Sequence, residues 1–156
     1  MRRDYFDLAV TEAEWVDSDG SPAMPRLVIT YDGPRDTLRS VFEIGAEPRG
    51  AGTIDVAFRL QGSIDASDAD GVLSVSDRLT GDFLIEVNTD VDPVLTFLRA
   101  ARRYCEAEAD AEGRYALEIR PGEGSSLVFE KGTFLVYNAD GSLLRQHSLI
   151  PSGVEL

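Results

Sequence analysis

The chain has 156 residues, and its 28 Asp and Glu against 15 Lys and Arg give a formal net charge of −13. A hydrophobic content of 43% is enough for a packed core, which excludes global disorder, and the length suits one domain over residues 1–156. Because such a charge repels nucleic acid and anionic membranes, neither partner is expected. The longest uncharged run, 146–154, has nine residues, whereas a membrane-spanning helix needs about 20.

No apolar stretch follows the N-terminus, so no signal peptide is expected, and Cys105 is the only cysteine, which excludes an internal disulfide. We therefore expect a cytoplasmic protein. The basic residues are unevenly divided, because 14 are Arg and only Lys131 is Lys. Acid excess with lysine depletion is typical of halophilic proteins, which work in molar salt that screens the repulsion. An ordinary acidic domain from a GC-rich genome is the alternative.

The first part of the chain alternates apolar and polar residues in the manner that predicts β-strands. Strands are expected at residues 4–10, 26–31, 54–60, 72–76 and 83–88. The clearest is 54–60, where every second residue from Ile54 to Leu60 is apolar. Residues 35–43 fit a short helix, although Leu38, Phe42 and Ile44 also fit an alternating strand.

A long amphipathic helix is predicted at about residues 92–107, with Asp92 as the N-cap and Pro93 as the first helical residue. Its apolar face carries Val94, Phe97, Leu98, Ala101, Tyr104 and Cys105 at helical spacing. Further strands are expected at 115–119, 127–130, 133–137 and 143–150, the last two joined by a hairpin turn at 138–141. Together these elements predict an α+β fold, a mainly antiparallel sheet with the helix packed on one face.

Few residues suit metal or nucleophilic chemistry. With one Cys and one His the usual zinc ligand sets are incomplete, and neither a P-loop nor a G-x-S-x-G motif occurs. His147 falls on the predicted last strand, where a surface position is favoured over a catalytic base. Cys105 falls on the apolar helix face, where packing is favoured over reactivity. No cofactor and no catalytic residue are expected.

The acidic loop 65–77 is one candidate binding site. Residues 66–77 partly resemble a calcium-binding EF-hand loop, and Asp68, Asp70 and Asp77 are the candidate metal ligands. The first-position Asp and the final bidentate Glu are missing, and strands flank the loop where an EF-hand has helices. In so acidic a chain, chance clustering is the favoured interpretation.

The second candidate site is the only local basic surface. Arg99, Arg102 and Arg103 lie on the polar face of the predicted helix, where they could contact an acidic partner. An ordinary solvated helix face is the simpler interpretation, because cations suit the C-terminal half of a helix. The ending 150–156 is apolar apart from Glu155, and we expect it to dock on its own domain, with insertion into a partner or a second copy as the alternative.

Four runs of the chain resemble a family of small acidic haloarchaeal proteins of unknown function. They are MRRDYF at 1–6, DVAFRLQG at 55–62, TGDFLIEVN at 80–88 and LRQHSLIPSGVEL at 144–156. The resemblance spans nearly the whole chain and implies an archaeal, cytoplasmic, single-domain protein. It implies no catalytic or binding residue.

The expected function is that of a non-enzymatic protein-interaction or regulatory module of a halophilic archaeon. A protein partner or a second copy would bind through the helix arginines or the C-terminal tail. A domain that binds a small ligand or a divalent metal through the acidic loop 65–77 is the first alternative. A carboxylate-based, Mg²⁺-dependent enzyme is the second, because the many Asp and Glu residues do not exclude one.

Overall fold

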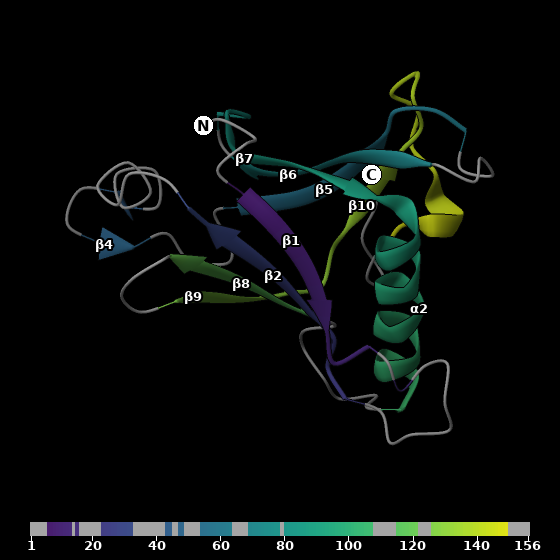
Figure 1. Cartoon of the computed structure of the whole chain (residues 1–156), viewed down its shortest axis with the longest axis horizontal. Helices are drawn as coiled ribbons and strands as arrows, with labels where there is room; N and C mark the ends of the chain where they lie inside the picture. Colours follow the sequence, from purple (N-terminus) through teal and green to yellow (C-terminus); the bar gives the residue numbers. More distant parts are fainter. Residues whose placement is uncertain are drawn as a thin grey trace.

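Two four-stranded β-sheets share one apolar core in the computed structural model (Figure 1). The structure describes residues 6–13, 15, 23–32, 43–44, 47–48, 54–63, 69–78, 80–107, 115–121 and 126–149. The first sheet, in spatial order, consists of β1 (Phe6–Thr11), β2 (Arg26–Tyr31), β8 (Tyr115–Pro121) and β9 (Leu127–Lys131). The second consists of β10 (Leu135–Tyr137), β5 (Ile54–Leu60), β6 (Asp70–Asp77) and β7 (Phe83–Asp90). A small third sheet pairs β3 (Glu43–Ile44) with β4 (Glu47–Pro48).

This arrangement confirms the α+β class, and most neighbouring strands are antiparallel as expected. The strands divide between two main sheets where one was expected, and each main sheet contains one parallel pair. These pairs are β2 with β8 and β5 with β10. Parallel neighbours come from distant parts of the sequence, so alternation within one strand cannot reveal which strands pair.

The predicted alternation of 54–60 is confirmed in β5, because its apolar residues from Ile54 to Leu60 are all buried. Asp55, Ala57 and Arg59 occupy the intervening positions, and they therefore lie on the face of the second sheet that points away from the core. β6 repeats the pattern, with Leu73 and Val75 in the core. The second sheet thus has one apolar inner face and one solvent-facing outer face.

A long helix, α2 (Val91–Ala107), follows β7 directly and packs beside both sheets (Figure 1). It begins one residue before the expected N-cap Asp92, and the N–H of Val91 donates to Ala69 O at 3.0 Å. The predicted apolar face is buried at Val94, Phe97, Leu98 and Ala101, and Tyr104 is half-buried. The side chain of Cys105 lies outside the described part of the structure. No helix among the described residues is long and apolar enough to span a bilayer.

The segment between β9 and β10 passes from the first sheet to the second. Lys131, the last residue of β9, is buried, and its Nζ donates to Ile54 O at 2.8 Å. Phe134 packs against Phe97 of α2 and Tyr115 of β8, with ring centroids 5.5 and 6.0 Å apart respectively. This segment therefore ties both sheets and the helix together.

The strand predicted at 143–150 is wrong. Leu143 and Leu149 each form an isolated bridge, and between them lies the 3₁₀ turn η4 (Arg145–His147). The cause is Ser148, whose Oγ donates to Leu144 O at 2.8 Å and accepts the N–H of Val136 at 2.9 Å. These side-chain bonds coil the chain and replace a regular strand ladder.

The short helix expected at 35–43 falls mostly outside the described residues, which begin again at Glu43. Glu43 itself, with Ile44, belongs to strand β3. The described part of this region therefore follows the alternating pattern.

Gly71 of β6 lies where two strands press against each other. A Cβ atom at this position would lie 2.5 Å from both Arg59 O and Phe58 Cζ. Such distances are well inside van der Waals contact, so the core residue Phe58 or the β5 backbone has to move when a side chain is added.

We predict that Gly71→Ala lowers the free energy of unfolding by about 1–3 kcal/mol, as overpacking in a core does. Urea denaturation followed by circular dichroism measures this change. Gly62→Ala is the matched control, because its Cβ would meet nothing within 4 Å, and it should change stability by about 0.5 kcal/mol at most. Equal stabilities for the two variants would contradict the close packing at Gly71.

Candidate functional site

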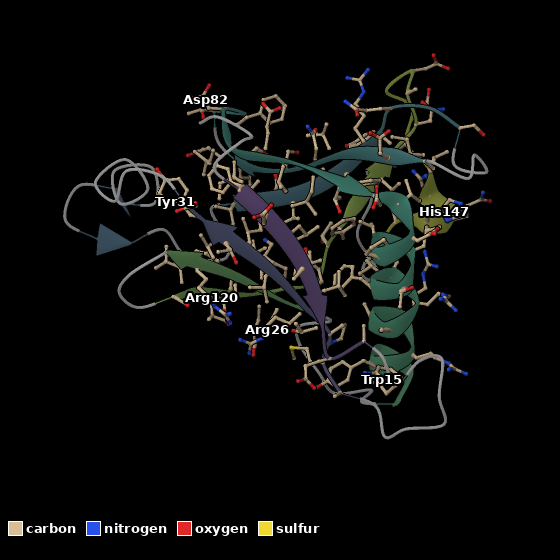
Figure 2. All side chains as sticks on the ribbon, in the orientation of Figure 1. Trp15, Arg26, Tyr31, Asp82, Arg120 and His147 are labelled. Atoms are coloured by element: carbon tan, nitrogen blue, oxygen red, sulfur yellow. The ribbon has the colours of Figure 1, made fainter. Side chains whose placement is uncertain are left out.

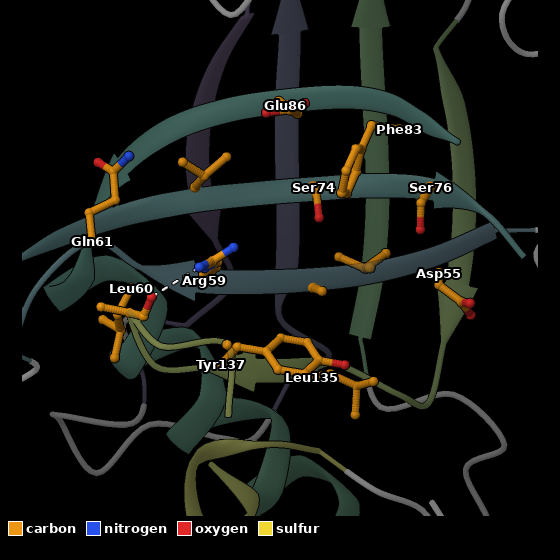
Figure 3. A pocket seen from close by; sticks show the side chains of 15 residues that line it. Asp55, Arg59, Leu60, Gln61, Ser74, Ser76, Phe83, Glu86, Leu135 and Tyr137 are labelled. Carbon is orange, nitrogen blue, oxygen red and sulfur yellow. Dashed lines mark hydrogen bonds between the residues drawn. The ribbon is translucent and has the colours of Figure 1, made fainter. Parts of the chain in front are cut away.

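A groove of about 820 Å³ lies on the outer face of the second sheet, opposite the core (Figure 3). Its floor is made of small side chains at the centre of the sheet. Strand register places Leu135, Ala57, Ser74 and Glu86 in one row across the four strands. Because Ala57 and Ser74 are short, the two central strands leave a depression between their larger neighbours.

The walls of the groove come from the two outer strands. Leu135 and Tyr137 of β10 form one wall, and Phe83 and Glu86 of β7 form the other. Three interstrand spacings separate β10 from β7, which makes the groove about 14 Å wide. The four-residue step along β5 between Asp55 and Arg59 makes it about 13 Å long.

Phe83 owes its position to a β-bulge. The pairing of β6 with β7 shifts between Val75 and Ser76, so that Phe83 lies opposite Ser76 while Ile85 lies opposite Val75. The shift turns Phe83 to the outer face, where its side chain is 63% exposed, and it leaves Leu84 and Ile85 buried. A large aromatic side chain is thus presented to solvent at the groove wall.

The two ends of the groove carry opposite charges, as Figure 3 shows for Asp55 and Arg59. Oδ1 of Asp55 accepts two hydrogen bonds from Arg78, at 3.0 Å from Nε and 2.8 Å from Nη2. At the other end, Nη2 of Arg59 donates to Ala139 O at 3.0 Å. Among the described residues Arg59 has no carboxylate partner. The Asp55 end is therefore neutralised, whereas the Arg59 end keeps a positive charge.

Lys131 lies beneath the Asp55 end, bonded to the backbone of β5. Burial lowers the pKa of its ammonium group, nearby Arg78 lowers it further, and Asp55 opposes both effects. In the core behind it, burial and then the charge of Asp55 raise the pKa of Tyr115, whose hydroxyl donates to Thr133 O at 2.5 Å. The Lys131 ammonium and the Tyr115 hydroxyl each donate to a backbone carbonyl. These bonds give both side chains a structural role.

The two candidate metal ligands that the structure describes lie far apart. Asp70 and Asp77 are the first and last residues of β6, which places them about 23 Å apart, and Asp68 lies outside the described residues. Oδ1 of Asp77 accepts the N–H of Thr80 at 3.0 Å and so stabilises the turn after the strand. In the described part of the chain no three His, Cys, Asp or Glu residues form a group suited to a metal ion.

The three helix arginines have different surroundings. Nη2 of Arg102 donates to Gln146 O at 2.6 Å and to Ser148 O at 3.3 Å, which attaches the C-terminal segment to α2. Arg99 and Arg103 are exposed, and Nη2 of Arg99 donates to Thr96 Oγ1 at 3.3 Å. Arg102 therefore serves the fold, and only its two neighbours present an exposed basic surface.

His147 lies in the turn η4 and is half-buried, and it is not on a strand as expected. Its Nε2 lies 3.5 Å from Nε2 of Gln146. Figure 2 places it beside the top of α2, and it is not among the residues that line the groove. Residues 150–156, where the docked tail was expected, lie outside the described part.

Sequence reasoning did not select the groove residues. Asp55, Ala57 and Arg59 were expected on the solvent face of their strand, which is correct, but nothing local showed that the neighbouring strands add small residues there. The available signal was the set of short side chains Ala57, Ser74 and Ser76 on outward positions. This signal does not identify Tyr137 or Phe83 as groove residues. Tyr137 reaches the groove through the parallel pairing of β10 with β5, and Phe83 reaches it through the bulge between β6 and β7.

A second charged cluster lies on the outer face of the first sheet. Glu118 of β8 is buried, and it is bound by Arg26 of β2 and by Arg120, the two arginines that Figure 2 labels on this side of the sheet. The Nε and Nη2 atoms of Arg120 lie 2.8 and 2.6 Å from Oε2 of Glu118. Burial raises the pKa of the Glu118 carboxyl, but the hydrogen bonds and charges of Arg120 and Arg26 outweigh burial, so that the pKa is lowered. Both oxygens are occupied, which makes the cluster a cross-strand tie.

We predict that Glu118→Gln lowers the free energy of unfolding by about 2 kcal/mol at pH 7, because two arginines lose their shared carboxylate. The pKa of Glu118 in the folded protein is lower than the usual 4.5, so its ionised form stabilises the fold at pH values above 4.5. This stabilisation is lost as the pH falls through the lowered pKa. The difference from the wild type should therefore shrink below about pH 4.

Urea denaturation between pH 3 and pH 7 measures this difference. Glu130→Gln, an exposed position on the neighbouring strand β9, is the control and should have little effect throughout. A Glu118→Gln effect that stays constant over the whole pH range would contradict the ion-pair explanation.

Comparison with known proteins places the whole chain in one family. A family of unknown function, DUF5793, matches residues 1–156, which agrees with the resemblance to a family of unknown function. No curated protein and no solved structure has a significant match to the chain. Because the match covers the full length, the chain belongs to DUF5793, a family of unknown function.

Proposed function

We propose that the protein is a non-enzymatic binding module, and that the groove on its second sheet binds a small organic molecule. The observation that carries the proposal is the pairing of a floor of small side chains with an exposed aromatic wall. Ala57 and Ser74 form the floor, and Phe83 is 63% exposed beside them. A ligand in the groove would cover this apolar surface and gain the free energy of removing it from water.

The size and lining of the groove support a small ligand. Its volume of about 820 Å³ lies within the range of small-molecule sites. The walls add Leu135 and Tyr137 on one side, and the hydroxyls of Ser74 and Ser76 have no hydrogen-bond partner among the described residues. Such a mixture of apolar walls and a few polar groups is typical of ligand sites.

The charged groups of the groove support binding more than catalysis. Oδ1 of Asp55 already accepts two hydrogen bonds from Arg78, and the pair neutralises that end of the groove. The proposal keeps the expected non-enzymatic character, but it replaces the expected protein partner by a small ligand, as in the first alternative, at a site other than the acidic loop 65–77. It moves the contact surface away from the helix arginines, of which Arg102 is engaged with the C-terminal segment.

We predict that Ser74→Trp abolishes binding of the neutral fluorescent dye N-phenyl-1-naphthylamine, because an indole at this position fills the floor of the groove. The wild type should bind the dye with a saturable, one-to-one fluorescence increase. Val128→Trp is the matched control, since it adds the same side chain at a position of the first sheet that is 51% exposed, and it should bind like the wild type.

Circular dichroism verifies that both tryptophan variants are folded. Absence of saturable binding to the wild type would contradict the proposal. So would equal binding by all three proteins, because the dye would then occupy a different surface.

We also propose that the protein works in molar salt in the cytoplasm of a haloarchaeon. Two features of the fold support this origin. Among the acidic residues whose exposure is described only Glu118 is buried, and the single lysine of the chain, Lys131, is buried too. The surface is therefore acidic, and its described basic side chains are all arginines.

We predict that transfer from 3 M to 0.1 M KCl unfolds the protein, because the Debye length increases to about 10 Å and the acidic residues then repel one another. Far-ultraviolet circular dichroism and a melting curve at each concentration measure the change. An unchanged spectrum and melting temperature would favour an ordinary acidic domain.

A further inference from the structure

We infer that the ligand of the groove is an organic anion, with an apolar ring system against Phe83 and one anionic oxygen group bound by Arg59. This inference rests on the proposed function and specifies the chemical class of the ligand. It is carried by a cation that lines an apolar groove and has no carboxylate partner in the described part of the structure.

Arg59 is oriented by a hydrogen bond to a turn. In the described part of the chain its one hydrogen bond goes to Ala139 O, in the turn that joins β10 to the C-terminal segment (Figure 3). Oδ1 of Asn138 accepts the N–H groups of Asp140 and Ser142 at 3.0 and 2.9 Å, and Gly141 adopts a φ of +86°. These bonds define the position of Ala139 O, and the bond to Ala139 O orients the exposed guanidinium.

The remaining donors of Arg59 are available for an anion. A guanidinium has five N–H groups, and its planar fork matches a carboxylate or phosphate group. One of these groups is used by Ala139, and no described residue uses the others, which can bind a ligand in the groove. The bond to Ala139 O limits the conformations of the side chain, which lowers the entropic cost of ordering it when the anion binds.

The acidic residues of the groove do not cancel this charge. Asp55 lies about 13 Å from Arg59 along β5 and is already paired with Arg78. Glu86 belongs to β7, two strands from β5, which corresponds to about 10 Å across the sheet. An anion in contact with Arg59 is therefore much closer to the guanidinium than to either carboxylate, and salt screens the longer interactions most.

The apolar surface lies on the Phe83 side of the groove. Phe83 lies in the same cross-strand row as Asp55 and Ser76, at one end of the groove. Arg59 lies at the other end, two residues after Ala57 along β5. A ring system on Ala57 and Ser74 would contact Phe83 at one end and direct its anionic group to Arg59 at the other. The groove thus sets both the chemistry and the direction of the ligand.

The test compares two molecules of equal shape and different charge. 1-Naphthoate carries a carboxylate, and 1-naphthamide is its neutral counterpart. Each competes with N-phenyl-1-naphthylamine bound to the full-length wild type at constant KCl. We expect naphthoate to displace the dye at about a tenfold lower concentration, which is the effect of one charge-assisted contact.

Arg59→Gln should remove this preference for the carboxylate. The preference is measured as the ratio of the naphthamide and naphthoate concentrations that displace half of the dye, so it does not depend on the variant's own affinity for the dye. Arg59→Lys keeps the charge without the fork and should retain part of the preference. Arg99→Gln is the matched control, because it removes one exposed positive charge from α2, outside the groove, and should retain the full preference.

Each failure has a separate meaning. Equal displacement by naphthoate and naphthamide on the wild type overturns the anion inference, whether or not the variants fold. A preference that survives in folded Arg59→Gln also overturns it, because the carboxylate then binds elsewhere. Dye binding that is absent, or that persists in Ser74→Trp, overturns the proposed groove itself.

Discussion

The fold depends on the place where the chain crosses from the first sheet to the second, between β9 and β10. Lys131 reaches across this boundary to Ile54 O, and Phe134 inserts between α2 and β8. Once these contacts form, β10 can pair with β5, and that pairing brings Tyr137 and Leu135 to the groove. The site on the outer face therefore rests on contacts made in the core.

Single-strand alternation and helical spacing were enough to predict most elements, because each depends on neighbours only a few residues apart. The buried residues of β5 and the apolar face of α2 are examples. The groove depends on information of another kind. A bulge at Val75 and Ser76 reverses the face of Phe83, and a hydroxyl of Ser148 replaces the expected last strand with a turn. Neither event changes the hydropathy pattern.

Charge has a different meaning inside the protein and on its surface. At the surface, acidic side chains are numerous and most are solvated, so their number says more about the solvent than about a partner. Inside, the two buried ionic groups among the described residues have dedicated partners, because an unpaired buried charge costs several kcal/mol. Lys131 donates to a backbone carbonyl, and Glu118 is bound by two arginines. Composition alone could not distinguish these two groups from the rest.

The same contrast explains why a single arginine could select a ligand. In molar salt the long-range field of a protein with a net charge of −13 is screened, so an anion is held only where it touches a cation directly. Three of the other described arginines bind a carboxylate, namely Arg78, Arg26 and Arg120. Arg102 donates to two backbone carbonyls of the C-terminal segment. Arg59 has one backbone bond and faces an apolar groove. Its charge is therefore directed at whatever fills that groove, and the apolar walls restrict the choice to anions that also carry an apolar part.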